Sequence, residues 1–413
     1  MFLRVWLMKN RIGRVFAALS LAMVILAQTV VSPNIVAASH GHVTPISVSL
    51  SQMPSDYIEH LPIYVQESSD FISFGFDGTG TPDDPFAIEG LNITATTRCV
   101  YLQNISDHVV IRNCYFRASN YQFPCVALDH TNQTTFEKCI FQGGSCGMSL
   151  ANTAFISAAD NIFLEAEIGI RATSAFMFNC SRCRILNNEY GILLSESHVC
   201  NLTRNKVYRN SEFGICMGLE SVNNLVTENT VGRNHASEIE INAIDIGLSN
   251  NWTGNYWSDY APPGPYTISG AASSTDNTPS KFQDDQSPFL EAHQDLFYAE
   301  GSTGNEIQWN ATDEFSWTYV ITRGTQVEKE GTWISQIITF EIDGLPQGNH
   351  MFQIRLFDID GNEAFDDVEV FVFVIIFSNI GTTELMIGSL GSVGFVLGVL
   401  IFFKMRQKRH SSI

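Results

Sequence analysis

The stretch VVIRNCYF (109–116) recurs along the chain in five further copies with the same apolar pattern. The copies are TTFEKCIF (134–141), ISAADNIF (156–163), FNCSRCRI (178–185), CNLTRNKV (200–207) and NLVTENTV (224–231). The sixth position of each copy, which we call the anchor, is Asn or Cys. The six anchors are Cys114, Cys139, Asn161, Cys183, Asn205 and Asn229, and they follow one another at steps of 25, 22, 22, 22 and 24 residues. A fixed period of this size is typical of a stacked solenoid.

A less perfect first copy, FAIEGLNI (86–93), has Leu91 at the anchor. A second motif follows each of these seven positions, a small residue and then two apolar residues separated by one position. It reads CVYL (99–102), CVAL (125–128), GMSL (147–150), GIRA (169–172), GILL (191–194), GICM (214–217) and EIEI (238–241). Each repeat thus holds two short alternating runs, which is strand periodicity, and no stretch long enough for an amphipathic helix. The pattern predicts an all-β, right-handed parallel β-helix of about seven coils over residues 86–262.

The leucine-rich repeat is the competing fold, because it also stacks Asn or Cys at a similar period. It needs a Leu-rich strand and a helical or 3₁₀ return segment in every repeat. Here the return segment carries its own strand-like motif, which favours the β-helix. The anchors should then form an internal ladder. A buried Asn would bond turn backbone and the next Asn, whereas Cys would fill the same small space without that demand.

Both ends of the chain carry membrane-related signals. Residues 1–38 combine four basic residues, an apolar run and a small-residue stretch, the layout of a secretory signal peptide, with an uncleaved anchor as the alternative. Residues 385–403 are free of charge and long enough to cross a bilayer. Basic residues follow in the tail, 404–413, and place it in the cytoplasm. We therefore expect a single-pass cell-membrane protein with its ectodomain outside.

The exterior part is strongly acidic. Removing the four basic residues at each end from the 23 Lys and Arg leaves 15 against 43 Asp and Glu, a formal charge of −28. Such a surface argues against binding to nucleic acid. All nine Cys lie between 99 and 216, and Cys99 and Cys125 occupy matching positions of neighbouring coils, which makes them a candidate disulfide.

The segments around the repeats have separate roles. Residues 39–85 are placed to cap the open end of the solenoid; their Asp77, Asp83 and Asp84 are candidate Ca²⁺ ligands or turn residues. Residues 263–284 have linker composition. Residues 285–376 hold longer alternating strands, as in a small antiparallel β-sandwich, and a juxtamembrane linker follows at 377–384. Within the sandwich, 358–362 (DIDGN) reads as a hairpin turn or a Ca²⁺ loop. No other cofactor is predicted.

Two motifs carry a family resemblance. GNYWSDY (254–260) after the repeats and TPDDPFAIEG (81–90) before them resemble the NosD-like right-handed β-helix proteins over about residues 60–280. The resemblance implies the same fold and relatives that bind or hydrolyse carbohydrate. The acidic loop that usually follows GNYWSDY is replaced here by APPGPYTI (261–268). The segment 344–372 looks like the last two strands of Ig-like or fibronectin-III-like modules.

The aromatic residues of the GNYWSDY region have two interpretations. Trp252, Tyr256, Trp257 and Tyr260 either stack on sugar rings or cap the last coil with bulky side chains. For copper binding, the role attached to the family name, soft or imidazole ligands should cluster. The ten His are scattered, so no metal site is predicted.

The candidate ligand-binding residues are Arg182, Arg184, Arg204 and Lys206, with Arg209 nearby. They should project from one face of two consecutive coils and repel one another unless an anion lies between them. That anion is either a surface glutamate (Glu189, Glu196, Glu212 or Glu220) or an acidic glycan, whose carboxylates suit Arg.

The positions beside the anchors also show whether a pair of catalytic carboxylates is present. The positions just before and just after the anchors stack no two carboxylates on neighbouring coils, so no catalytic residue is predicted. The pair Asp129-His130, also found in some pectate lyases, is interpreted as a turn. The sequence therefore predicts a cell-surface, non-enzymatic β-helix protein that binds polysaccharide or another surface partner. A polysaccharide lyase or glycoside hydrolase is the alternative.

Overall fold

The computed structural model describes residues 57–235, 240–334 and 337–375. The predicted signal peptide, juxtamembrane linker, membrane span and tail lie outside these residues. Within them, no helix is both long enough and apolar enough to cross a membrane.

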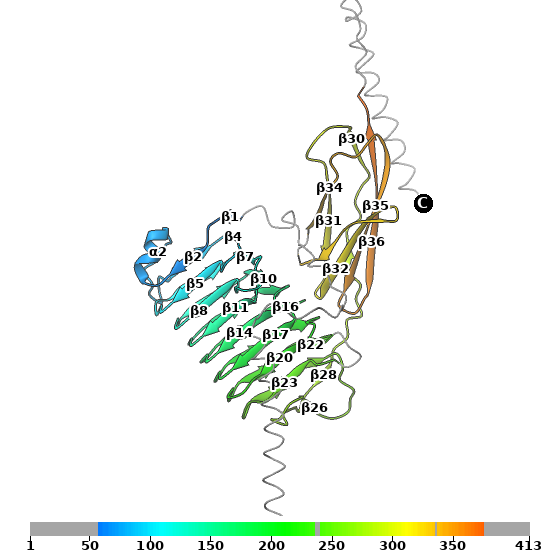
Figure 1. Ribbon diagram of the computed structural model, residues 1–413. Coiled ribbons are helices and arrows are strands. Elements are labelled where there is room, and N and C mark those ends of the chain that lie inside the picture. The colour runs from blue at the N-terminus through cyan, green and yellow to red at the C-terminus, as the bar shows by residue number, and fades with distance from the viewer. Residues whose placement is uncertain (1–56, 236–239, 335–336, 376–413) are drawn as a thin grey trace, which may run out of the picture.

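The repeats form a parallel β-helix of about 8 turns, with an antiparallel sheet arrangement after it (Figure 1). Each complete coil contributes one strand to each of three sheets, which we call sheets A, B and C. Within residues 86–235 and 240–281 no helix returns between strands, so the leucine-rich alternative is wrong.

The strands of the three sheets follow one another as C, A, B in each coil. Sheet A contains β1 (Ile58–Glu59), β4 (Leu91–Ala95), β7 (Tyr115–Ala118), β10 (Ile140–Gly143), β13 (Ile162–Leu164), β16 (Arg184–Leu186), β19 (Lys206–Tyr208), β22 (Thr230–Gly232), β25 (Tyr256–Trp257) and β28 (Ser280–Lys281). Sheet B contains β2 (Ile63–Val65), β5 (Val100–Gln103), β8 (Val126–Asp129), β11 (Cys146–Ala151), β14 (Ile168–Thr173), β17 (Tyr190–Ser195), β20 (Phe213–Met217) and β23 (Ala243–Asp245). Sheet C contains β3 (Phe86–Glu89), β6 (Val109–Arg112), β9 (Thr134–Glu137), β12 (Ser157–Ala159), β15 (Asn179–Ser181), β18 (Asn201–Thr203), β21 (Leu225–Thr227), β24 (Asn251–Thr253), β27 (Thr275–Asp276) and β26 (Tyr266–Thr267).

The predicted register is correct across the repeats. Ile111 pairs with Phe136 in sheet C, and Phe116 pairs with Phe141 in sheet A, as the alignment on the anchors requires. These inward side chains are fully buried and stack coil upon coil. The buried apolar columns therefore form one continuous core along the solenoid.

The solenoid extends past both predicted boundaries. At the N-terminal end, β1 and β2 already pair with β4 and β5. Helix α2 (Ser68–Phe74), which the sequence analysis did not predict, then buries Phe71 against Phe86, with ring centroids 4.4 Å apart. At the other end, β27 and β28 lie in the predicted linker and continue sheets C and A. These additions raise the count above the predicted seven coils.

The predicted strand motif EIEI (238–241) falls partly outside the described residues. Glu240 and Ile241 lie outside any strand, and the next strand of sheet B is β23, Ala243–Asp245, which pairs with β20. The buried Asn242, just before β23, accepts at Oδ1 a hydrogen bond from Nδ2 of Asn234, which follows β22 on the same coil.

The anchors form a fully buried internal ladder in the turn between sheets C and A. The Asn members donate from Nδ2 to a carbonyl of the preceding coil: Asn161 to Phe136, Asn205 to Cys180 and Asn229 to Leu202. Their Oδ1 atoms also accept a backbone N–H of that coil, as Asn205 does from Cys183 at 2.9 Å. Each Asn thus ties its coil to the one before it.

The Cys anchors make only the first of these two contacts, the hydrogen bond to a carbonyl of the preceding coil. The Sγ atoms of Cys114, Cys139 and Cys183 donate to Ile88, Ile111 and Ala158, the carbonyls that Asn would reach from the same positions. The expectation that Cys only fills space was therefore incomplete. Asn and Cys share this column because both are small and both donate to the same carbonyl.

A second Asn ladder lies in the turn between sheets A and B. Asn188, Asn210 and Asn234 are buried, and each Nδ2 donates to the Oδ1 of the next Asn at 2.9–3.0 Å. Sequence analysis missed this ladder, although its spacing of 22 and 24 residues follows the same period.

Glycine begins the second motif because adjacent coils approach closely there. A Cβ atom added at Gly169 would lie 2.7 Å from the carbonyl oxygen of Gly191 on the next coil. A separation under 3.0 Å would force the backbone apart. The small residue of the motif is thus required by coil stacking.

All nine cysteines are buried free thiols, so the predicted Cys99–Cys125 disulfide is wrong. The two side chains instead donate to backbone carbonyls, Cys99 Sγ to Ile93 at 3.2 Å and Cys125 Sγ to Gln142 at 3.2 Å. Burial raises the pKa of Cys99 and Cys216 to about 12, and that of Cys146 and Cys200 to about 11.

Thiol chemistry gives a direct check of this arrangement. At pH 8 the four thiols of raised pKa should react with iodoacetamide about 100-fold more slowly than in the unfolded chain, because so little of their thiolate is present. The other native thiols should be protected by their burial. In denaturant without reductant, all nine should react. A smaller number in denaturant, or rapid labelling of the native protein, would show that the thiols are paired or exposed.

Two further sheets form the C-terminal sheet pair, residues 289–373. The smaller sheet holds β29 (Phe289–Leu290), β31 (Glu306–Thr312) and β34 (Ile337–Glu341). The larger holds β30 (Leu296–Ala299), β36 (Glu363–Phe373), β35 (Gly348–Asp358), β32 (Ser316–Arg323) and β33 (Gln326–Thr332). Only β30 and β36 pair in parallel among these described strands. Side chains of both sheets, such as Trp309 and Ile354, share one buried core.

Candidate functional site

The four predicted binding residues lie on two neighbouring coils. Arg182 and Arg204 occupy the left-handed turn position before each anchor, with φ of 52° and 56°. Arg184 and Lys206 begin β16 and β19 and pair directly in sheet A. The four side chains nevertheless divide into two groups with different surroundings.

Arg182 and Arg204 form exposed ion pairs along the turn column. Arg182 donates from Nε and Nη2 to the two carboxylate oxygens of Asp160, both at 2.8 Å. Arg204 donates from Nε to Oε2 of Glu228 at 2.6 Å, and its side chain is 65% exposed. The hydrogen bonds from Arg182 lower the pKa of Asp160. Both acids come from the same column, one coil away, and are not among the four glutamates expected from sequence.

Arg184 and Lys206 contact the C-terminal sheet pair. Arg184 Nη2 donates to the Ser316 hydroxyl at 2.7 Å and to the Tyr208 hydroxyl at 2.8 Å. Lys206 Nζ lies 2.6 Å from a carboxylate oxygen of Glu314 and 4.5 Å from the ring centroid of Phe315. These two cations of sheet A therefore bind the C-terminal sheet pair to the solenoid.

Arg209 and Arg233 extend the same contact surface. The Arg209 guanidinium lies 3.8 Å from the ring centroid of Trp317 and donates from Nη2 to the Ile359 carbonyl. Arg233 Nε donates to a carboxylate oxygen of Asp360 at 2.7 Å. The strongest concentration of basic side chains on the solenoid is thus turned toward the sheet pair.

Apolar packing completes this interface. Buried side chains from sheet A lie against buried side chains from the segment after β28 and from the sheet pair: Leu164, Leu186 and Tyr208 against Phe282, Phe315 and Ile359. An amide of the solenoid adds polar contacts, because Asn187 Nδ2 donates to the Thr332 hydroxyl at 2.7 Å. Sheet A and the sheet pair consequently form a packed interface.

Arg204 also borders an open hollow at the end of the solenoid, which we call the Arg204 hollow. It has a volume of about 460 Å³ and is lined by Arg204, Glu228, Gly254, Tyr256, Thr278 and Ser280. The Tyr256 side chain is 43% exposed. A cation, a carboxylate, two hydroxyls and an exposed aromatic ring therefore meet there. These groups can hydrogen-bond sugar hydroxyls or a sugar carboxylate and pack against a pyranose face.

The other aromatic residues of the GNYWSDY region are structural. Trp252 and Trp257 are 1% and 0% exposed, and Trp257 stacks on Tyr266 with centroids 4.2 Å apart. Their indole N–H groups donate to Asp245 and Asp276. The two tryptophans therefore cap the last coil, whereas the ring of Tyr256 is exposed.

A second hollow, of about 430 Å³, follows the turn between sheets B and C and is largely apolar. We call it the apolar hollow. Phe155, Met177 and Val199 occupy equivalent left-handed positions on three successive coils and are 55%, 37% and 44% exposed. A left-handed conformation is unusual for a bulky side chain.

One column stacks carboxylates on neighbouring coils. Tyr190 pairs with Ile168 and Phe213, which aligns the preceding residues Glu167, Glu189 and Glu212. Burial, together with the charges of the two neighbouring glutamates, raises the pKa of Glu189. The sequence analysis searched only the columns beside the anchors and missed this one, although its spacing of 22 and 23 residues was visible.

The pair Asp129-His130 lies where β8 ends at Asp129 and the chain bends at His130. His130 has a left-handed φ of 48°, and its Nδ1 lies 2.7 Å from a carboxylate oxygen of Asp129. The side chain of His130 is 60% exposed.

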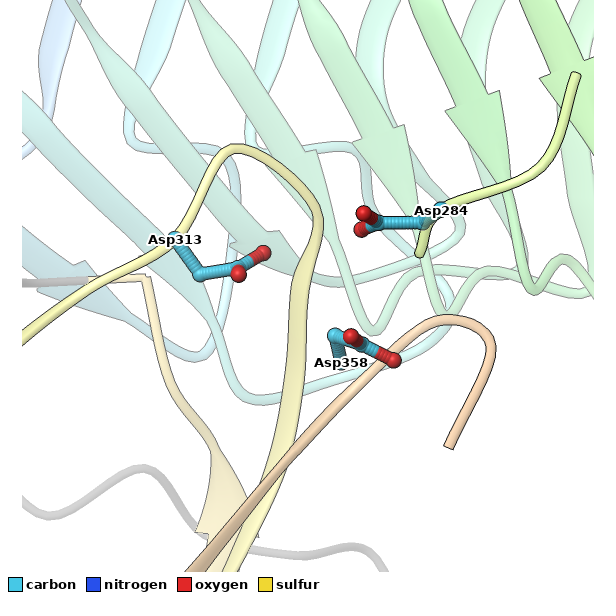
Figure 2. A group of neighbouring side chains, drawn as sticks. All are labelled: Asp284, Asp313 and Asp358. Atoms are coloured by element: carbon cyan, nitrogen blue, oxygen red, sulfur yellow. The ribbon is translucent and has the colours of Figure 1, made fainter. Parts of the chain in front are cut away.

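Three aspartates converge where the solenoid meets the sheet pair (Figure 2). One carboxylate oxygen from each of Asp284, Asp313 and Asp358 lies within 4.8 Å of those of the other two. Burial and the neighbouring charges of Asp284 and Asp358 raise the pKa of Asp313 to about 6. This is the only group of three or more His, Cys, Asp or Glu ligands found among the described residues.

Comparison with known proteins identifies the solenoid. Residues 83–262 match the family model described as Periplasmic copper-binding protein (NosD). The solenoid is similar to the NosD family over these residues. No curated protein matches the chain.

Several solved structures match parts of the chain. The enzymatically active domain of bacteriophage CBA120 tailspike protein 2 is 9% identical, with a TM-score of 0.36, and the match covers 79% of this chain and 72% of that one. The periplasmic alginate epimerase AlgG is 15% identical, with a TM-score of 0.26, and the match covers 49% of this chain and 60% of that one. A fibronectin(III)-like module of Clostridium thermocellum CbhA is 16% identical, with a TM-score of 0.17, over 22% of this chain and 99% of that one.

The copper binding in the family description does not fit the donors found among the described residues of this chain. Copper favours imidazole, thiolate or thioether ligands. The one cluster among the described residues is made of carboxylates alone, and the nine thiols are dispersed through the buried interior. We therefore derive no function from copper.

Proposed function

We propose that this chain is a non-enzymatic surface protein that binds polysaccharide, with acidic sugars as the preferred ligands, through the Arg204 hollow. The observation that carries the proposal is the meeting of Arg204, Tyr256 and the hydroxyls of Thr278 and Ser280 in one open hollow. Of the four predicted binding residues, Arg184 and Lys206 are used in the domain interface, whereas Arg182 and Arg204 face solvent.

The Arg204–Glu228 pair does not prevent ligand binding. Exposed ion pairs contribute little free energy, about 0–1 kcal/mol, so a uronate carboxylate can compete with Glu228 for the guanidinium. The planar guanidinium binds a carboxylate through two parallel hydrogen bonds. Glu228 would then accept hydrogen bonds from sugar hydroxyls.

The proposed location of the chain at the cell surface is based on the sequence signals at its two ends. Residues 1–38 would direct secretion, residues 385–403 would anchor the chain by a single span, and the tail would lie in the cytoplasm. The C-terminal sheet pair would serve as an Ig-like or fibronectin-III-like module that holds the solenoid away from the membrane. Polysaccharide outside the cell is then the accessible ligand.

Binding to immobilised glycans tests the proposal. We expect the purified chain to bind polygalacturonate, and Arg204→Ala to weaken that binding about 10- to 100-fold, the loss of a charge-assisted hydrogen bond worth about 1.5–3 kcal/mol. Tyr256→Ala should weaken it about tenfold through lost ring packing. A sulfated dextran and neutral dextran, measured in parallel, separate charge from sugar recognition.

Arg112→Ala is the matched control. Arg112 forms an ion pair with Glu89 at 2.8 Å and is 46% exposed, but it does not line the hollow. Its substitution should leave binding unchanged. Equal loss in Arg112→Ala and Arg204→Ala, or no binding to any of the three glycans, would refute the proposal.

The second candidate function is hydrolysis or elimination of polysaccharide. The stacked Glu167, Glu189 and Glu212 favour it, because a carboxyl group of raised pKa beside a second carboxylate is the arrangement of a general acid and its partner. If the wild type released sugar from the same glycans and Glu189→Gln did not, the function would be catalysis and not binding alone.

A further inference from the structure

Two sequence motifs that the proposed function does not use lie beside the apolar hollow. NCS (179–181) and NLT (201–203) are Asn-x-Ser/Thr sequons, the acceptor motif for N-linked sugars in secreted proteins. They form strands β15 and β18, and Asn179 pairs with Asn201 in sheet C. The two sequons are therefore stacked in register on neighbouring coils.

The strand geometry turns both sequons outward. Their middle residues, Cys180 and Leu202, are fully buried, so the Asn and the hydroxyl residue on either side face away from the core. Asn179 is exposed, and Asn201 is half-buried. The Thr203 hydroxyl donates to Oδ1 of Asn201 at 2.8 Å, whereas Nδ2 of neither Asn donates to a residue that the structure describes. Nδ2 is the atom that carries an N-linked sugar, so both side chains can hold one in the folded chain.

The structure separates these two sequons from the others of the chain. Asn92 is buried, and its Nδ2 donates to Glu59 at 2.6 Å, between β4 and β1. Oδ1 of Asn132 accepts the backbone N–H of Ala154 on the next coil at 2.8 Å. Asn92 and Asn132 thus hold neighbouring coils together. Three further sequons begin at exposed residues that do not line the hollow: Asn104, Asn251 and Asn310.

The apolar hollow gives the pair a second, independent feature. Asn179 and Asn201 line it together with Met177 and Val199, each of which lies two residues before its Asn. The two apolar side chains are 37% and 44% exposed. Clustered apolar side chains at a surface mark a place that contacts something else. A sugar attached to either Asn begins beside them, and the C–H face of a pyranose packs against such side chains.

We propose that Asn179 and Asn201 carry N-linked sugars whose first residues cover the apolar hollow. The inference rests on the proposed location outside the cell, because this modification belongs to secreted chains. Nδ2 would attack C1 of an oligosaccharide linked to a lipid phosphate: the C1–N bond forms, the C1–O bond to the phosphate breaks, the lipid phosphate leaves, and the amide proton passes to a base. A membrane transferase of the host cell supplies the catalyst and the lipid-linked oligosaccharide. These sugars are part of the protein, unlike a polysaccharide bound reversibly in the Arg204 hollow.

Glycopeptide mass spectrometry of the full-length chain, isolated from the cells that make it naturally, tests the inference. We expect sugar on Asn179 and on Asn201, and its loss at the substituted position in Asn179→Gln and in Asn201→Gln. Ser181→Ala should lose the sugar of Asn179 although the carboxamide remains, and Ser181→Thr should keep it, because the motif requires a hydroxyl residue. In the double variant Asn179→Gln/Asn201→Gln, the fluorescence of an added apolar dye should rise about twofold, because the hollow is uncovered.

Asn223→Gln is the matched control, because the exposed Asn223 lines the same hollow but begins no sequon. It should change neither the sugars nor the dye fluorescence. The inference is overturned if Asn179 and Asn201 carry no sugar, or if the double variant binds no more dye than the wild type. Unmodified chains that dimerise, and become monomers in Phe155→Ser, would assign the hollow to a second copy.

The proposed function is measured separately on the same proteins. Binding to polygalacturonate should be unchanged in the double variant, because neither Asn lines the Arg204 hollow. Labelling of intact cells with a membrane-impermeant biotin reagent reports whether the chain is at the surface. Surface-labelled chains that bind polygalacturonate but carry no sugar on Asn179 and Asn201 would overturn this inference and leave the proposed function standing.

Discussion

Substitution of Asn205 by alanine is expected to lower the free energy of unfolding of the solenoid by about 3–5 kcal/mol. The carboxamide accepts the Cys183 N–H at 2.9 Å and donates to the Cys180 carbonyl at 2.9 Å. Alanine would leave both buried backbone groups without a partner, at about 1–3 kcal/mol each, and open a small cavity. Urea unfolding followed by circular dichroism measures the change.

Asn205→Cys is the matched variant for this prediction. The chain itself places cysteine in the anchor column, and the Sγ of Cys183 donates to the carbonyl one coil back at 3.5 Å. The variant should therefore keep one of the two contacts and lose only about 1–3 kcal/mol. Equal loss in both variants would mean that the hydrogen bonds of the ladder contribute little.

Reversal of charge at Arg209 is expected to separate the C-terminal sheet pair from the solenoid. The Arg209 guanidinium lies 3.8 Å from the Trp317 ring centroid, and it donates to the Ile359 carbonyl. In Arg209→Glu, a buried carboxylate would replace this cation among the charges of Asp358, Asp360 and Glu240, which interact with Arg209. Uncompensated buried charge costs about 3–5 kcal/mol.

Limited proteolysis and small-angle scattering detect the separation. We expect cleavage between residues 283 and 288 to accelerate at least tenfold in Arg209→Glu, and the radius of gyration to increase. Arg204→Glu is the control, because Arg204 pairs with Glu228 on the solenoid and not with the sheet pair. If the two variants are cleaved at the same rate as the wild type, the interface does not depend on these cations.

The sequence was most informative where the chain repeats. The step of about 22 residues places the anchors in one turn and sets the strand register, because every coil must stack inward side chains on those of the previous coil. Asn188, Asn210 and Asn234 and the stacked glutamates follow the same period. They lie in columns away from the anchors, so an alignment on the anchors alone does not reveal them.

The interface could not be predicted in the same way. Arg184 meets Ser316 and Lys206 meets Glu314, and these contacts join positions 132 and 108 residues apart, where no period relates the partners. The basic residues were found from their spacing, but which of them face solvent depends on the position of the sheet pair. The three converging aspartates, Asp284, Asp313 and Asp358, likewise come from three separate segments, of which only 358–362 carried a recognisable signal.

Arg184 and Lys206 hold the sheet pair, and we propose that Arg204 and Tyr256 receive the sugar. A crystal structure of the chain with trigalacturonate tests this assignment most directly. We predict a uronate in the Arg204 hollow, with its carboxylate bound to Arg204, its ring against Tyr256, and the contacts to Ser316 and Glu314 intact. Trigalacturonate bound on sheet A with the sheet pair displaced, or bound in the apolar hollow at Phe155, would contradict the account.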